Sequence, residues 1–242
     1  MIDDWLRMID EIINKNIVLT LWLSLSFSLF GQDWPELNRY RAHNAKLGLP
    51  AANENRIVFM GNSITEGWST VLPEYFSGKS YVNRGISGQT TPQMLVRFRA
   101  DVIDLKPKAV VILAGTNDIA GNTGPATVKM IADNIISMAE LARENNILVV
   151  ISSVLPVYDY SWKPGLEPVP KISKLNEIIK NYALNHRHTY LDYYAAMVDD
   201  KKGLDEKYTS DGVHPNKAGY KVMTTLAEQA IAKTLDYARL KK

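Results

Sequence analysis

A serine in the first third of the chain and an aspartate–histidine pair near its end have the side chains that acyl transfer needs. Ser63 lies in the segment GNSIT, directly after the apolar run of residues 56–60. Asp211 and His214 lie in the segment DGVHP, just before the last predicted helix. A serine hydroxyl is a weak nucleophile at neutral pH, so it needs a histidine base whose tautomer a carboxylate fixes. These three residues predict a Ser-His-Asp triad.

Two further segments contain groups that stabilise an oxyanion. Residues 83–90 read NRGISGQT, and residues 115–118 read GTND directly after the apolar run of residues 109–113. An oxyanion hole needs pre-aimed donors, which are backbone N–H groups or a side-chain amide. A glycine lets the backbone approach a substrate without a Cβ in the way, and Gly85 and Gly88 both qualify.

The four segments, in their order and spacing, resemble the blocks of the SGNH hydrolases, also called GDSL-type esterases and lipases. The resemblance places the nucleophile at Ser63 and its partners at Asp211 and His214. It implies an oxyanion hole formed by the backbone N–H groups of Ser63 and Gly88 and by the side-chain amide of Asn117. A serine that follows a strand is often only a helix N-cap, but the three partner segments favour a nucleophile here.

Two positions separate this chain from related patterns. Asn62 stands where the name-giving motif of the family has aspartate, next to the nucleophile. Thr65 stands where the G-x-S-x-G elbow of the α/β-hydrolases has glycine, which argues against that fold.

Apolar runs alternate with helical segments along the chain. Strands are predicted at residues 56–60, 80–83, 109–113, 147–154 and 189–192. Helices are predicted at residues 33–47, 91–105 with Thr91 as the N-cap, 125–145, 171–185 and 216–237. This alternation predicts an α/β fold with a parallel sheet between helices, whose ligands bind beyond the carboxyl ends of the strands. The resemblance adds a three-layer α/β/α sandwich with a mostly parallel five-stranded sheet, the flavodoxin-like fold of SGNH hydrolases.

Composition excludes several other functions. The net charge of +2 and the lack of a basic cluster with interleaved aromatic residues argue against a nucleic-acid partner. The chain has no cysteine, which excludes disulfides, a thiol nucleophile and a lipidated cysteine. Asp211 and His214 provide two of the about three ligands of a hydrolytic metal site, and no other cluster provides the third. We therefore expect no metal and no cofactor.

The N-terminal region resembles a secretory signal. The uncharged run of residues 17–30 is shorter than the about 20 residues of a membrane span and fits the apolar core of a signal peptide. We interpret residues 1–31 as a signal peptide and residues 32–242 as one hydrolase domain, secreted or periplasmic and not inserted in a membrane after cleavage. Residues 1–14 are acidic, which indicates an over-extended start. An uncleaved membrane anchor and a buried amphipathic helix are the alternatives.

Several polar and aromatic side chains are candidates for substrate contact. Trp162 and Tyr158 lie in a proline-rich segment that leaves them free to form a platform for a sugar or acyl group. Trp68 is a weaker aromatic candidate, since aromatic residues more often lie in the core. Arg84 and Glu66 either touch substrate or form ion pairs that brace the loops.

These observations predict a serine esterase that removes short acyl groups, acetyl above all, from a small ester or an acetylated glycan. A lysophospholipase or thioesterase of the same family is the first alternative. A non-catalytic sugar- or lipid-binding protein is the second, and its mark would be the loss of a catalytic group. The sequence leaves the acyl length, the alcohol and the oligomeric state open.

Overall fold

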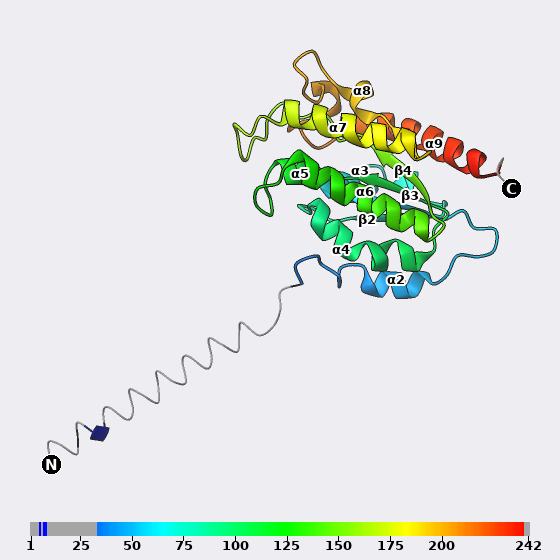
Figure 1. Cartoon of the computed structure of the whole chain (residues 1–242), viewed down its shortest axis with the longest axis horizontal. Coiled ribbons are helices and arrows are strands. Elements are labelled where there is room, and N and C mark those ends of the chain that lie inside the picture. Colours follow the sequence, from blue (N-terminus) through cyan, green and yellow to red (C-terminus); the bar gives the residue numbers. More distant parts are fainter. Residues whose placement is uncertain (1–4, 6, 9–32, 240–242) are drawn as a thin grey trace. The chain divides into compact units, whose positions relative to one another are not determined.

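Five parallel strands form the sheet at the centre of the fold (Figure 1). A computed structural model of the protein describes residues 33–239 together with residues 5, 7 and 8. The chain divides into the units Met1–Trp34 and Pro35–Lys242, and every element below belongs to the second. In sheet order, the strands are β2 (Tyr81–Gly85), β1 (Ile57–Gly61), β3 (Ala109–Leu113), β4 (Leu148–Ser152) and β5 (Thr189–Leu191). The predicted parallel sheet is confirmed, and each strand lies within two residues of its predicted start.

The carboxyl ends of the three strands at one side of the sheet are in register. Gly61, the last residue of β1, pairs with Gly85, the last residue of β2. Gly61 also pairs with Leu113, the last residue of β3. Because parallel strands in register end at the same edge, the segments that follow these strands begin at one rim of the sheet.

Helices cover both faces of the sheet. Alternate residues of a strand point to opposite faces, and Val58 and Met60 of β1 pack in the same core cluster as residues of α4, α6 and α7. Ile57 and Phe59 pack in the other cluster, with residues of α3, α8 and α9. Figure 1 shows α4, α6 and α7 across the near face. The helices are α2 (Arg41–Leu47), α3 (Ser63–Val71), α4 (Thr91–Asp101), α5 (Thr116–Ile119), α6 (Val128–Glu144), α7 (Pro168–Asn185), α8 (Tyr193–Met197) and α9 (Lys217–Arg239). The three-layer α/β/α prediction is confirmed.

Two predicted helix starts are wrong. The helix predicted from residue 33 begins only at Arg41, because Glu36 adopts a left-handed φ of 54° that a helix cannot contain. Thr91 is the first residue of α4, and Thr90 is the N-cap. The Thr90 N–H donates to Oε1 of Gln93 at 3.0 Å, as in a capping box. The Thr91 hydroxyl is not free to cap, because it donates to Asp118 at 2.6 Å.

The helices α3, α5 and α8 were not predicted. Each begins within three residues of the end of a strand, and each is short. Their apolar residues are too few to show a helical period, and α3 buries only Ile64, Thr65 and Trp68. The first two of these short helices carry candidate site residues, because Ser63 begins α3 and Asn117 lies in α5.

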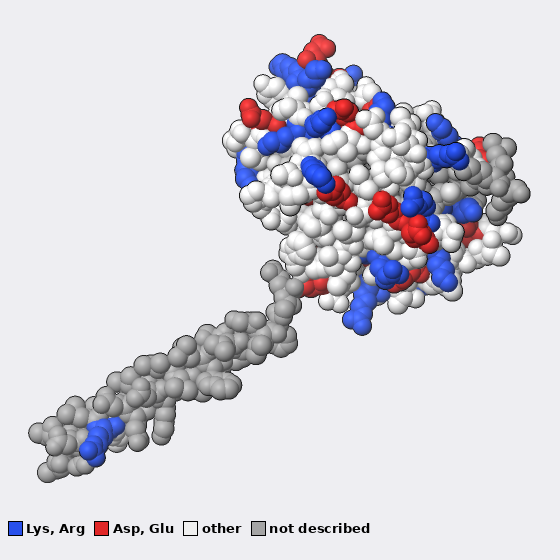
Figure 2. Space-filling view, viewed as in Figure 1, with Lys and Arg blue, Asp and Glu red and all other residues white. Residues whose placement is uncertain are grey.

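Surface charge and helix hydrophobicity can be compared with the predicted partners and location of the protein. On the face drawn in Figure 2, basic and acidic side chains are interspersed. Within the described part of the chain, no helix combines the length and the apolar character that crossing a membrane requires. The predicted signal peptide lies outside the described residues except at residues 5, 7 and 8.

Candidate active site

Ser63 is held at the first turn of α3 by a cap that belongs to its neighbour. The Asn62 side chain accepts the Ile64 N–H at 3.0 Å, so Asn62 and not Ser63 is the N-cap of the helix. Ser63 follows β1 by two residues and is partly exposed. Because capping occupies Asn62, the Ser63 hydroxyl is available for another partner.

That partner is His214. The Ser63 Oγ lies 2.9 Å from His214 Nε2, although 151 residues separate the two in the chain. On the other side of the ring, His214 Nδ1 lies 2.7 Å from Asp211 Oδ2. A carboxylate beside Nδ1 favours the tautomer with its proton there, which leaves Nε2 as an acceptor for the Ser63 hydroxyl. The structure thus brings the three predicted triad residues together, with His214 between Ser63 and Asp211.

Asp211 is fixed by its own loop. Its Oδ1 accepts the backbone N–H groups of Val213 at 2.9 Å and His214 at 2.7 Å. Burial raises the pKa of Asp211, but the hydrogen bonds from His214 and Val213 prevail and lower it to about 2. Asp211 is therefore a carboxylate except at strongly acidic pH, and its Oδ2 faces His214.

Thr209 is a site residue that the sequence analysis missed. Its hydroxyl donates to the His214 carbonyl oxygen at 2.8 Å and accepts the Gly212 N–H at 3.0 Å. These bonds close the loop that carries Asp211 and His214. A threonine shortly before an Asp-Gly pair is a known side-chain turn pattern and was the available signal.

The candidate oxyanion donors lie at the same rim of the sheet. Within the described part of the chain, the backbone N–H groups of Ser63 and Gly88 donate to no other group. Asn117 is 6% exposed, and its amide donates one hydrogen to the Gln89 carbonyl oxygen at 3.0 Å. That bond orients the amide and leaves its second hydrogen for a ligand.

The structure gives Gly85 and Gly88 different tasks. A Cβ on Gly85 would lie 2.1 Å from the backbone nitrogen of Glu66, so Gly85 permits β2 and α3 to touch. Gly88 has a φ of 77°, which side chains disfavour, and a Cβ there would meet nothing closer than 4.0 Å. Of the two glycines, Gly88 is therefore the one that lies at the open rim of the sheet, where a ligand can approach its backbone.

Asp118 holds the Asn117 segment against α4. Its two oxygens each lie 3.0 Å from the Thr91 nitrogen, and Oδ1 also accepts the Thr91 hydroxyl. Burial raises the pKa of Asp118 to about 6, although the hydrogen bonds from Thr91 act in the opposite direction. This buried carboxyl joins α5 to the first turn of α4, beside the candidate oxyanion donors.

Among the candidate substrate contacts, Trp162 lies beside the triad. Its ring centroid is 6.4 Å from that of His214, and its side chain is 50% exposed. Tyr160 packs against Trp162 at 5.3 Å and anchors the loop through a 2.8 Å hydrogen bond to the Thr116 carbonyl oxygen. Tyr158 is exposed on the same loop, and its Cβ approaches Gly203.

The structure does not place Arg84 or Trp68 at the site. Arg84 is 1% exposed, and its guanidinium donates to Asn44 Oδ1 and to the Asn83 carbonyl oxygen. Trp68 is equally buried and stacks on Tyr75 at 4.9 Å. The assignment of Arg84 to substrate binding is wrong, because its donors are used inside the fold.

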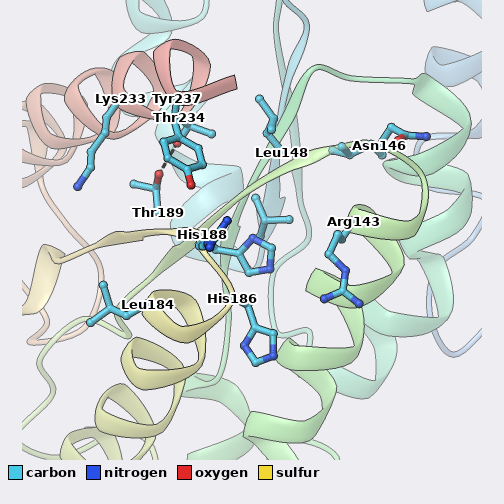
Figure 3. Close-up of a pocket in the computed structure, with 13 residues that line it drawn as sticks. Arg143, Asn146, Leu148, Leu184, His186, His188, Thr189, Lys233, Thr234 and Tyr237 are labelled. Atoms are coloured by element: carbon cyan, nitrogen blue, oxygen red, sulfur yellow. Dashed lines mark hydrogen bonds between the residues drawn. The ribbon is translucent and has the colours of Figure 1, made fainter. Parts of the chain in front are cut away.

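A cavity of about 630 Å³ lies at the opposite end of the sheet (Figure 3). It is lined by Leu148 and Thr189, the first residues of β4 and β5, and by residues near the ends of α6, α7 and α9. Because Ser63 and Asn117 follow the carboxyl ends of strands, this cavity is separate from the candidate active site. Among the described residues, no three His, Asp or Glu side chains are grouped to hold a metal ion.

Comparison with known proteins identifies the family. The sequence model of the GDSL-like Lipase/Acylhydrolase family matches residues 59–222, a range that includes Ser63 and His214. The chain belongs to this family. A GDSL-like lipase or acylhydrolase is an ester hydrolase, so the match agrees with the resemblance noted in the sequence.

Solved structures of the family share the fold. A Bacteroides fragilis protein (BF3764) assigned as an acylhydrolase is 50% identical, with a TM-score of 0.83, over 84% of this chain and 99% of that chain. A GDSL-like lipase (BT0569) from Bacteroides thetaiotaomicron is 47% identical, with a TM-score of 0.80, over 82% of this chain and 98% of that one.

Curated relatives are matched over part of their length. The lipoprotein YqeF of Bacillus subtilis is 33% identical over 103 residues, which are 41% of this chain and 42% of YqeF. An acetylxylan esterase of Xylanibacter ruminicola is 24% identical over 222 residues, which are 76% of this chain and 45% of the esterase. The chain thus spans less than half the length of these two relatives.

Proposed function

We propose that this protein is a serine esterase that removes short acyl groups, acetyl above all, from carbohydrate esters. The observation that carries the proposal is the continuous contact from Ser63 Oγ through His214 to Asp211, with distances of 2.9 Å and 2.7 Å. Such a chain of contacts activates a hydroxyl for attack on an acyl carbon.

The proposed reaction has two halves. Ser63 Oγ attacks the ester carbonyl carbon while His214 Nε2 takes the hydroxyl proton. The negative charge that develops on the carbonyl oxygen is stabilised by the N–H groups of Ser63 and Gly88 and by the Asn117 amide. The bond to the alcohol then breaks as His214 returns its proton to the departing oxygen, and an acyl group remains on Ser63.

Water completes the cycle. It attacks the acyl carbon of the Ser63 ester while His214 takes one of its protons. Collapse of the second tetrahedral intermediate releases the carboxylic acid, and His214 returns the proton to Ser63 Oγ. Asp211 keeps its charge throughout and stabilises the His214 imidazolium that forms twice in each turnover.

Two features support a carbohydrate as the alcohol. The His214 and Asp211 side chains are 40% and 43% exposed, so the site is open to a large leaving group. Trp162 presents a half-exposed ring beside His214, and such a ring offers a flat apolar face to a sugar. A relative that acts on acetylxylan agrees with this substrate class.

The test is hydrolysis of p-nitrophenyl acetate, butyrate, octanoate and palmitate by the full chain and by its Ser63→Ala variant. Activity confined to acetate and butyrate, and lost in the variant, is the expected result. A maximum at octanoate or longer would replace the proposal with a lysophospholipase or thioesterase. No serine-dependent turnover on any ester, including acetylated xylo-oligosaccharides, would overturn it.

We also propose that the protein is exported, with residues 1–31 as its signal peptide and the hydrolase domain secreted or periplasmic. The uncharged run of residues 17–30 and the match to a lipoprotein support this location. N-terminal sequencing of the protein recovered from its host tests it. A mature N-terminus near residue 32 is expected, and one upstream of residue 17 would overturn cleavage in favour of an anchor.

A further inference from the structure

The loop that carries Gly88 is a β-turn. The Gln89 N–H donates to the Ile86 carbonyl oxygen at 3.3 Å and closes the turn. Gly88 has a φ of 77°, and Ser87 is not among the residues with positive φ. A β-turn in which only the third residue has positive φ is a type II turn, which favours glycine at that position.

In this turn type, rotation of one peptide would misdirect the candidate oxyanion donor, the Gly88 N–H. Types I and II differ mainly by a rotation of the central peptide, with φ of the third residue changing from about −90° to about +80°. In this turn the central peptide joins Ser87 to Gly88, so its rotation turns the Gly88 N–H away from the rim. Glycine adopts both conformations readily, and the turn therefore needs an outside hold to keep one of them.

Glu66 fixes Ser87, the residue on the N-terminal side of the Ser87–Gly88 peptide. It lies three residues after Ser63 on α3, which places it one helical turn from the candidate nucleophile. Its Oε2 accepts the Ser87 N–H at 2.9 Å and also the Ser87 hydroxyl. Burial favours the neutral acid, yet the hydrogen bonds from Ser87 and Arg39 prevail and lower the pKa of Glu66. An ionised carboxylate on the helix that begins at Ser63 thus accepts two hydrogen bonds from Ser87.

Asn122 fixes Gly88, the residue on the C-terminal side of the Ser87–Gly88 peptide. Its side-chain amide donates to the Gly88 carbonyl oxygen at 3.0 Å. Its backbone N–H donates to the Asn117 carbonyl oxygen, also at 3.0 Å. The second hold therefore ties Gly88 to Asn117, the other candidate oxyanion donor.

We propose that Glu66 is a positioning residue, which with Asn122 locks the Ser87–Gly88 peptide in the conformation that aims the Gly88 N–H at the oxyanion. The inference rests on the proposed esterase function. Glu66 anchors one side of the peptide to the nucleophile helix, and Asn122 anchors the other side to the Asn117 segment. The lock pre-aims the donor before substrate arrives, and donors aimed in advance are the effective ones.

Three variants test the lock by turnover. Glu66→Ala removes the grip on Ser87, and Asn122→Ala removes the grip on Gly88. Arg39→Ala is the matched control, because it breaks only the 2.6 Å ion pair on the other oxygen of Glu66. We expect Glu66→Ala to lower kcat on p-nitrophenyl acetate roughly ten- to hundredfold with KM changed less than about twofold. Asn122→Ala lowers kcat in the same way, and Arg39→Ala keeps the wild-type value.

Two further measurements separate positioning from folding. Inhibition by a phenylboronic acid, whose serine adduct uses the oxyanion donors, weakens in proportion to kcat if Glu66 aims Gly88. The ¹H–¹⁵N resonance of Gly88 in glycine-labelled protein, which has 14 glycines, shifts or broadens in Glu66→Ala. That spectrum needs no turnover, so it tests the lock even if the esterase proposal fails.

Some outcomes overturn the lock. An unchanged kcat and an unchanged Gly88 resonance in Glu66→Ala would refute it. Equal losses of kcat in Glu66→Ala and Arg39→Ala would assign the effect to the ion pair. Absence of Ser63-dependent turnover in the wild-type protein would instead refute the proposed function. The Gly88 resonance would then be the test of the lock.

Discussion

His214 Nδ1 lies 2.7 Å from Asp211 Oδ2, and the two residues are only three positions apart in one loop. The base and the carboxylate that orients it therefore come from one short loop, and their contact does not depend on Ser63. The same carboxylate also accepts the backbone N–H of His214 at 2.7 Å. Asp211 thus fixes both the ring and the backbone of the base.

Asp211→Asn tests this relationship. The amide donates a hydrogen where the carboxylate accepted one, so His214 adopts the wrong tautomer and kcat falls on the order of 10⁴-fold. Steady-state hydrolysis of p-nitrophenyl acetate measures the loss, and Asp200→Asn, at an exposed carboxylate, is the control. Retention of more than about a tenth of the wild-type kcat would contradict the role of Asp211.

Asn117→Ala removes the side-chain donor of the proposed oxyanion hole. Loss of one such donor lowers kcat on the order of 10²–10³-fold, with a smaller effect on KM because the charge develops only in the transition state. The exposed Asn145, which bonds the Leu141 carbonyl oxygen at the end of α6, supplies the control variant Asn145→Ala. A kcat for Asn117→Ala equal to that of the control would remove Asn117 from the mechanism.

Trp162→Ala separates sugar binding from chemistry. We expect KM for an acetylated xylo-oligosaccharide to rise roughly two- to tenfold, which corresponds to about 0.5–1.5 kcal/mol for a stacked ring. Ethyl acetate has no ring on its alcohol side that could stack on Trp162, so its KM stays unchanged. Tyr237→Ala is the control, since that aromatic side chain is exposed at the opposite end of the sheet. Equal effects of Trp162→Ala on both substrates would argue against a sugar platform.

Arg84→Ala affects stability rather than substrate binding. It leaves Asn44 Oδ1 and the Asn83 carbonyl oxygen without their buried donor. We expect the free energy of unfolding to fall by about 3 kcal/mol, because unpaired buried polar groups are costly. Urea unfolding measures the loss, and Arg99→Ala on the exposed face of α4 is the control. A raised KM in a fully stable Arg84→Ala protein would return Arg84 to the substrate site.

Asp118 makes stability depend on pH. Its pKa is about 6 in the folded protein against an ordinary 3.8, so between these values the folded state binds more protons than the unfolded state. The free energy of unfolding therefore falls as the pH rises through this window, by about 3 kcal/mol in total. Asp118→Asn removes this dependence, whereas Asp104→Asn on an exposed residue keeps it. Urea unfolding at pH 4 and pH 7 tests the prediction, and an equal pH dependence in wild type and Asp118→Asn would contradict it.

Local patterns in the sequence predicted the parallel sheet and one half of the candidate site, whereas the three-layer arrangement came from the family resemblance. Apolar runs that alternate with helical segments produce a parallel sheet, and residues that follow its strands must meet at one rim. Ser63 and Asn117 were therefore expected together. The spacing of Asp211 and His214 lies within one turn, so their contact also follows from short-range geometry.

The tertiary structure alone decided which side chains face the rim. The sequence favoured Trp162 as an aromatic contact and left open whether Arg84 touches substrate or braces a loop. The helices that cover β2 bury Arg84, whereas a loop anchored by Tyr160 leaves Trp162 exposed. The contact between Glu66 and Ser87 likewise depends on how closely α3 packs on β2. Sequence periodicity specifies which face of an element is apolar, whereas the neighbour that covers each polar side chain is set by packing between segments distant in the chain.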